Sequence, residues 1–339
     1  MGAPQEQAFT KVCRQTTLRT KRSTPVRHYG TQPPSEQQTN FSTLTEPTIH
    51  PVFEPVTGTF QYVIADHASK ASVIIDPVLD FDPSHSSIST KSADDILSLV
   101  ATKGYNVHYI LETHAHADHL SAASYLQAQL SKTGTRPDIG IGQRIGKVQQ
   151  LFGQRYGVLP REYNAVFDLL FSDNETFQLG TMQIEAIHLP GHTPDHMGYC
   201  IGSNVFCGDS LFHTDVGTAR TDFPGGSAHD LWESSQKLLA LPDETKIWTG
   251  HDYPPEGRKL PVPFMTVKQH KEGNKHVMAG RSREEFVKMR RQRDAALGAP
   301  RLLHQSLQIN VRGGRLPETG ESGQRVVKVP LKLDGAEAW

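Results

Sequence analysis

The sequence predicts an α/β domain built of layers, because short apolar runs alternate with longer segments of helical periodicity. Residues 92–103 show that periodicity clearly, since the apolar side chains between residues 96 and 100 fall on one side of a helix. A polar loop is expected to precede this helix and to reach Thr90. Strands are expected at residues 59–65, 71–75 and 107–111 and around residues 184, 199 and 205, and helices at residues 92–103, 120–130 and 229–241.

The C-terminal part predicts a helix and a strand that extend this domain. Ser282 and Glu285 have the spacing of a capping box, which would start a helix that reaches about Leu297. Residues 307–311 alternate between apolar and polar side chains, as an edge strand does. We therefore expect a main domain over residues 46–270 and an extension packed on it over residues 271–339.

The first 45 residues differ in composition from the rest. Residues 8–35 contain six Lys and Arg, many Ser and Thr, and no Asp or Glu. This composition is typical of a mitochondrial transit peptide, although a disordered basic tail has much the same composition. The expected location is the mitochondrial matrix, with the cytoplasm as the alternative, and residues 1–45 are expected to be disordered.

The charge balance favours small-molecule partners. The chain has 35 basic and 36 acidic residues and a formal net charge of −1, so no overall field attracts nucleic acid or an anionic membrane. No run reaches the ~18 apolar residues that a membrane-spanning helix needs. We expect no nucleic acid and no membrane as partners, and a homodimer stays open.

Three cysteines are too few for a disulfide framework. If Ser203 and Asn204 form a two-residue hairpin loop, Cys200 and Cys207 lie opposite each other on paired strands. We expect both thiols to be buried packing groups, with a redox pair as the alternative. Cys13 belongs to the N-terminal segment.

Residues 113–119 read Thr-His-Ala-His-Ala-Asp-His and follow the strand predicted at residues 107–111. Side chains at positions i and i+2 of an extended segment leave the same face, so His114 and His116 can converge on one ion. Asp118 and His119 lie one step further along and can reach a second position. Imidazole and carboxylate ligands suit zinc, iron or manganese. This pattern predicts a metal site.

Three later segments each offer one more ligand after a predicted strand. His192 follows a Leu-Pro-Gly turn, Asp209 follows a short apolar run and a glycine, and His251 follows a Trp-Thr-Gly run. A single histidine or aspartate in a turn is more often structural. The three together, in this order after the 113–119 run, indicate ligands of the same site.

These motifs resemble the metallo-β-lactamase superfamily, and within it the persulfide dioxygenases and their bacterial β-lactamase-like relatives. The resemblance covers roughly residues 48–270 and implies an αββα sandwich with the metal site at one edge of two sheets. Segments 53–60, 75–80, 113–119, 217–223 and 251–253 carry it.

The resemblance to persulfide dioxygenases implies one Fe(2+) per chain, held by His114, His192 and Asp209. Two histidines and one carboxylate on one face of an octahedron leave three positions open for a persulfide and O2. The implied reaction oxidises glutathione persulfide, or a similar thiol persulfide, with O2 to sulfite and thiol.

The same ligands also fit a hydrolase of this superfamily. His116, Asp118, His119 and His251 would then hold a second metal, with Asp209 between two Zn(2+) ions that activate water against a lactam, a lactone or a glutathione thioester. A member that binds without catalysis is a third alternative, against which the intact ligand set argues.

Two residues are candidates for substrate binding. Arg220 could pair with a glutathione carboxylate through its planar guanidinium, and its alternative role is an ion pair with Asp222 or Asp230. Tyr253 could donate a hydrogen bond to substrate or form only part of the wall.

Overall fold

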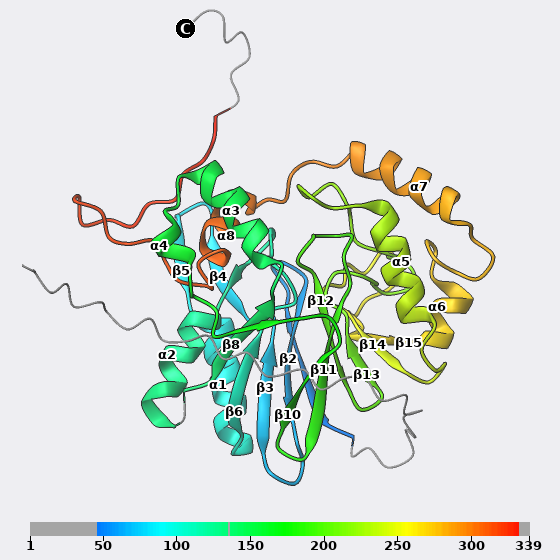
Figure 1. The fold of residues 1–339 in the computed structure, drawn as a ribbon, viewed down its shortest axis with the longest axis horizontal. Helices are drawn as coiled ribbons and strands as arrows, with labels where there is room; N and C mark the ends of the chain where they lie inside the picture. The colour runs from blue at the N-terminus through cyan, green and yellow to red at the C-terminus, as the bar shows by residue number, and fades with distance from the viewer. Residues whose placement is uncertain (1–45, 135, 332–339) are drawn as a thin grey trace, which may run out of the picture.

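Two six-stranded sheets face each other, and helices cover their outer faces (Figure 1). The computed structural model describes residues 46–134 and 136–331. The four layers confirm the αββα arrangement that the resemblance implies. The structure places the segments of the predicted metal site at one edge of these sheets.

The first sheet has the strand order β1-β2-β3-β6-β8-β9. Its first three strands pair antiparallel, and β3, β6, β8 and β9 pair in parallel. Every residue of β2 is buried, because one face of this strand meets the second sheet and the other meets the helices. The strands are β1 (Thr48–Glu54), β2 (Thr59–Ala65), β3 (Ala71–Ile75), β6 (Asn106–Leu111), β8 (Asp138–Gly142) and β9 (Leu169–Phe171).

The second sheet has the order β10-β11-β12-β13-β14-β15. Its neighbours pair antiparallel except for β13 and β14, which are parallel. Strands β11, β13 and β14 therefore run in the same direction and end at the same edge. The strands are β10 (Glu175–Leu179), β11 (Met182–His188), β12 (Met197–Ile201), β13 (Asn204–Phe206), β14 (Lys246–Trp248) and β15 (Phe264–Thr266).

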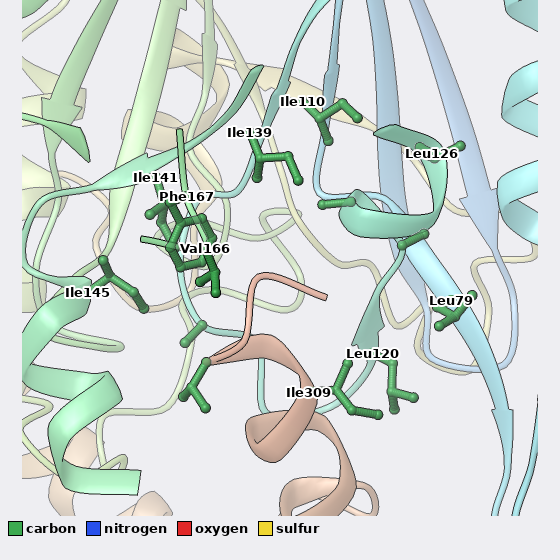
Figure 2. Packing of buried hydrophobic residues seen from close by; sticks show 14 of the residues in the cluster. Leu79, Ile110, Leu120, Leu126, Ile139, Ile141, Ile145, Val166, Phe167 and Ile309 are labelled. Atoms are coloured by element: carbon green, nitrogen blue, oxygen red, sulfur yellow. The ribbon is translucent and has the colours of Figure 1, made fainter. Parts of the chain in front are cut away.

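Three apolar clusters join the four layers. Aromatic side chains of both sheets, including Tyr62, Tyr199 and Trp248, fill the space between the sheets. A second cluster lies between the first sheet and its helices (Figure 2), and a third joins the second sheet to α5, α6 and α7. The helices are α1 (Lys91–Lys103), α2 (Ala123–Thr133), α3 (Ile145–Tyr156), α4 (Pro160–Tyr163), α5 (Ala228–Leu239), α6 (Val267–Gly273), α7 (Arg283–Ala295) and α8 (Leu303–Asn310).

The predicted polar loop before α1 is wrong. Strands β4 (Val78–Asp82) and β5 (Ser87–Ser89) form a hairpin there, and β4 also pairs with β7 (Leu120–Ser121). The alternation in β4 is weak because only Val78 and Leu79 are buried. Strand β7 also delays the start of α2 to Ala123, three residues later than predicted.

The predicted hairpin register at the cysteines is wrong, because the loop lies one residue earlier than predicted, which moves the partner of Cys200 by two residues. The loop is Gly202 and Ser203, where Gly202 adopts a positive φ, so Cys200 pairs with Val205. Cys207 lies beyond the strand and is buried, while Cys200 is half-buried. Both are free thiols, and burial raises the pKa of each to about 12. They are packing groups, and Cys13 lies outside the described residues.

The C-terminal strand predicted at residues 307–311 is wrong, because this segment lies in and just after helix α8. The predicted helix before it is confirmed as α7, with the capping box at Ser282. Residues 306–310 are all buried, so α8 has no exposed face and lacks the sequence pattern of an amphipathic helix. Ile309 packs near Leu120, beside the 113–119 segment (Figure 2).

Asn310 at the end of α8 holds the backbone of the 113–119 segment and of β7. Its Nδ2 donates to the carbonyls of His116 and His119, both at 2.8 Å, and its Oδ1 accepts from the amide of Ser121. One buried amide therefore satisfies three backbone groups around the predicted metal ligands. The C-terminal extension is part of the support of the site.

None of the described helices has the length and apolar character that a membrane span requires. Residues 1–45 lie outside the described residues, so the transit segment stays a prediction, as does the matrix location.

Replacing Asn310 with Ala should destabilise the protein by about 1–3 kcal/mol, because three buried backbone groups lose their partner. Chemical denaturation would measure the change in the free energy of unfolding. Gln305→Ala on the same helix is the matched control, since Gln305 is only half-buried and has no such role, and it should shift stability by no more than about 0.5 kcal/mol. An unchanged denaturation midpoint for Asn310→Ala would contradict this role.

Candidate metal centre

The predicted ligands meet at one edge of the two sheets. The 113–119 segment follows β6, His192 follows β11, Asp209 follows β13 and His251 follows β14. Because β11, β13 and β14 run in the same direction, their C-terminal ends present these side chains side by side. The structure therefore brings together all seven predicted ligands.

Two glycines allow the close approach of these loops. Gly208 has a φ of 48°, and a Cβ there would lie 2.6 Å from the Thr113 hydroxyl. A Cβ on Gly250 would lie 2.5 Å from Oδ1 of Asp209. The two backbones are joined by a hydrogen bond of 2.9 Å from the amide of Gly250 to the carbonyl of Gly208. Any larger residue would push the ligand loops apart.

Six of the seven predicted ligands form two groups, and within each group the ligand atoms lie within 4.8 Å of one another. The first group is His114, His192 and Asp209, and the second is His116, Asp118 and His119.

The Asp209 carboxylate stands between His192 and His251. Its Oδ2 is 3.6 Å from Nε2 of His192, and its Oδ1 is 3.6 Å from Nε2 of His251. Nε2 of His251 is also 3.1 Å from Oδ2 of Asp118. Ligands about 2.1 Å from an ion lie roughly 3 to 3.5 Å apart, so these spacings are close to those around a metal.

The proton of His114 is fixed by Thr113. The Thr113 hydroxyl donates to Oδ2 of Asp76 at 2.8 Å, so toward Nδ1 of His114, 3.0 Å away, it can only accept. Nδ1 of His114 therefore carries the proton, and Nε2 is left with a lone pair. That Nε2 is buried and has no hydrogen-bond partner.

Backbone carbonyls fix two more rings in the same way. Nδ1 of His192 lies 2.8 Å from the carbonyl of Arg220, and Nδ1 of His119 lies 3.2 Å from that of Leu120. A carbonyl only accepts, so each Nδ1 must carry the proton. Each Nε2 is then an unprotonated donor to a metal.

The ring of His116 has the opposite orientation, with Nδ1 instead of Nε2 toward the other ligands. Its Nε2 lies 3.1 Å from Asp76 and 3.2 Å from Glu112, so this nitrogen carries the proton and Nδ1 faces the ligand cluster. Burial lowers the pKa of His116, but the two carboxylates outweigh it and raise the pKa well above its ordinary value. Carboxylates behind a ligand ring make its other nitrogen a stronger electron donor.

His251 lies at the end of a series of hydrogen bonds between hydroxyl groups. Thr57 donates to Glu54 at 2.5 Å, and Thr59 lies 2.7 Å from Thr57 and 3.3 Å from Nδ1 of His251. Because the Thr57 proton goes to Glu54, Thr59 donates to Thr57 and accepts from His251. Nε2 of His251 faces Asp118 and Asp209. Burial lowers the pKa of His251, but these two carboxylates outweigh it and raise the pKa, so a proton or a metal ion is favoured at Nε2.

The site thus places electron-pair donors against one another, and only a cation among them, either a metal ion or a proton on His116 or His251, relieves their repulsion. Nitrogens of His114, His116 and His119 and carboxylate oxygens of Asp118 and Asp209 are buried without hydrogen-bond partners. Burial and the neighbouring imidazoles hold the pKa of His114 well below its ordinary value, and that of His119 at about 3, so both stay neutral. Unpartnered buried lone pairs are costly, and a metal cation satisfies all of them. The donor set fits a metal.

A cavity of about 450 Å³ opens onto the site. Of the seven ligands, only Asp118, His192 and Asp209 line it. His119 lines a second cavity, which shares Val56, Thr57 and Arg301 with the first.

The cavity wall also contains both predicted substrate residues. Tyr253 is half-exposed and stacks on His251 with ring centroids 5.6 Å apart. Arg220 is bound to Asp222 through two hydrogen bonds of 2.5 Å and donates a third to the carbonyl of Gly298. This pairing with Asp222 is the alternative role considered for Arg220. Its role as substrate anchor stays a prediction, as does a contact from Tyr253.

Sequence reasoning missed the groups that orient the ligands. Asp76, Glu112 and the Thr57–Thr59 pair hold ring protons, and Nε2 of His196 accepts from the amide of Asp209 at 2.9 Å. The available signal was the resemblance at segments 53–60 and 75–80, which contain no predicted ligand but supply Thr57, Thr59 and Asp76. Nothing in the sequence pattern pointed to His196.

Replacing Thr113 with Val removes the acceptor for His114 while keeping the side-chain shape, so the ring can turn or change tautomer. We expect the affinity for Zn(2+), measured by competition with a chelator, to fall about 10- to 100-fold. Thr176→Val, at an exposed position of β10, should leave the affinity unchanged. Equal zinc affinities for the two variants would refute the role of Thr113.

Comparisons with known proteins agree with this geometry. Residues 55–251 match the family described as the metallo-beta-lactamase superfamily. The beta-lactamase hydrolase-like protein of Xylella fastidiosa is 44% identical over 86% of this chain and 67% of its own. Glyoxylase B2 of Dictyostelium discoideum is 41% identical over 84% and 96%.

Persulfide dioxygenases appear in the same comparisons. The mitochondrial persulfide dioxygenase ETHE1 of Homo sapiens is 30% identical over 60% of this chain and 67% of its own. The crystal structure of ETHE1 from Myxococcus xanthus superposes with a TM-score of 0.63 at 27% identity, over 79% of this chain and all of that one. The chain belongs to the metallo-β-lactamase superfamily.

Proposed function

We propose that this protein is a persulfide dioxygenase that uses one Fe(2+) per chain. The observation that carries the proposal is the compact group of His114, His192 and Asp209. Two histidines and one carboxylate are the ligand set of non-haem iron oxygenases, in which three positions stay open. The similarity to the human and Myxococcus ETHE1 proteins supports the same activity.

The surroundings of these ligands suit access from one side. His192 and Asp209 line the cavity, whereas His114 is fully buried behind them. The apolar side chains of Phe212 and Val216 in the cavity wall limit the water that reaches a bound persulfide.

The ligands and the groups that orient them each have a defined role in this proposal. His114, His192 and Asp209 hold the iron, and Thr113 and the Arg220 carbonyl keep the two rings in the tautomer that binds it. Iron bound there would supply the redox chemistry between O2 and sulfur. The overall reaction converts a thiol persulfide, O2 and water into thiol, sulfite and two protons.

A dinuclear hydrolase is the second candidate, and one observation favours it. His116, Asp118 and His119 form a second donor group, and the Asp209 carboxylate reaches toward both His192 and His251. Two Zn(2+) ions on this set would activate water against a lactam, a lactone or a glutathione thioester. The similarity to the hydrolase-like protein and to glyoxylase B2 supports this reading.

Protein loaded anaerobically with Fe(2+) should consume O2 when glutathione persulfide is added and should release one sulfite per O2. An oxygen electrode and a sulfite assay measure the two quantities. Under argon, no sulfite should form. Hydrolysis of a thioester or lactam by a two-zinc form, without any persulfide oxidation, would contradict the dioxygenase and support the hydrolase.

Variants of the predicted ligands distinguish a mononuclear from a dinuclear metal centre. His192→Ala and Asp209→Ala should each lose iron and activity together, since each removes one of only three protein ligands. His251→Ala should keep most of the iron and lose turnover, because His251 lies beside Asp209 but outside the iron group. Elemental analysis and initial rates give both quantities. A loss of half of the bound metal in His251→Ala would indicate a dinuclear centre.

A further inference from the structure

The C-terminal extension forms part of the wall of the cavity at the metal site. Five of the lining residues belong to α7 or to the segment between α7 and α8: Arg290, Arg293, Leu297, Pro300 and Arg301. That segment runs from α7 back toward α8 along the top of the view in Figure 1. Three of these five residues are arginines.

Two of the four cavity arginines are already neutralised. Arg220 is bound to Asp222, as described above. Arg290 is buried, donates to Asp294 at 2.6 and 3.0 Å and donates to the carbonyl of Thr218. Both guanidinium groups therefore serve as structural links within the wall.

The other two arginines of the cavity are not neutralised in this way. Arg293 and Arg301 are exposed, and within residues 46–331 neither forms an ion pair with a described carboxylate. The two carboxylates that line the cavity, Asp118 and Asp209, face the metal position. The cavity thus combines a metal position with two cations that are free to bind an anion.

We propose that Arg293 and Arg301 bind the carboxylates of the thiol substrate, and this inference rests on the proposed function. A guanidinium pairs with a carboxylate through two parallel hydrogen bonds. Glutathione has a carboxylate near each end and its sulfur between them, so two arginines can hold the ends while the sulfur reaches His192 and Asp209. The cavity volume of about 450 Å³ lies within the roughly 300–1,000 Å³ usual for small-molecule sites.

The test compares Arg293→Gln and Arg301→Gln with the wild-type protein, all loaded with iron. Each variant should raise KM for glutathione persulfide about tenfold, and the double variant should raise it further, with iron content and thermal stability unchanged. The persulfide of 2-mercaptoethanol has no carboxylate, so its KM should not change. Arg291→Gln is the matched control, because Arg291 lies on the same helix, faces His229 and does not line the cavity.

Three outcomes would overturn the proposal. They are an unchanged KM for glutathione persulfide, an equal rise for both persulfides, and an equal rise in the Arg291 control.

A binding measurement keeps this proposal separate from the proposed function. Titration calorimetry with glutathione should show about tenfold weaker binding to each variant than to the wild type. If the wild-type protein oxidises no persulfide but this difference is found, the dioxygenase fails and the carboxylate site stands. Equal glutathione affinities of wild type and double variant, or no binding to the wild type, would overturn the carboxylate site whatever the reaction.

Discussion

The orientation of five buried imidazoles is the constraint on which the rest of the site depends. In each ring, one N–H donates to an acceptor outside the ligand cluster, and the other nitrogen faces the cluster. The two carboxylates inside the cluster add further lone pairs. In a buried site, this arrangement is costly unless a cation lies among the donors. The acceptors that hold the protons therefore matter as much as the ligands themselves.

The fold supplies these acceptors from distant parts of the chain. Glu54 and Thr59 come from the first hairpin, Asp76 follows β3, and the carbonyl that holds His192 belongs to Arg220. Asn310 reaches the same region from the C-terminal helix. The site is thus assembled by both sheets and by the extension, and its ligand geometry depends on the packing of the whole domain.

The sequence predicted which candidate ligands lie together far better than it predicted their surroundings. Ligands stand in short motifs after apolar strands, where residue type and spacing carry the chemistry, and all seven meet in the structure. The partners of these ligands, such as Thr113, Glu112 and His196, are ordinary residue types whose role exists only in three dimensions. For Arg220 the sequence left two roles open, and the structure shows the pairing with Asp222.

Predictions of secondary structure were wrong where buried segments showed no clear periodic pattern of apolar residues. Residues 306–310 of helix α8 are all buried, so residues 307–311 show no helical stripe and a short alternation suggested a strand. At the cysteine hairpin, one residue of difference in the loop changed the partner of Cys200, because the register of a hairpin follows its turn. The αββα layers were predictable because strands and helices long enough to show their period dominate the two sheets and their covering helices.

Anomalous diffraction at the iron edge, from crystals of the Fe(2+)-loaded protein grown without oxygen, tests the central claim most directly. The account predicts one iron peak per chain, within bonding distance of His114, His192 and Asp209. A peak of equal height among His116, Asp118 and His119, or iron only at that second position, would contradict it.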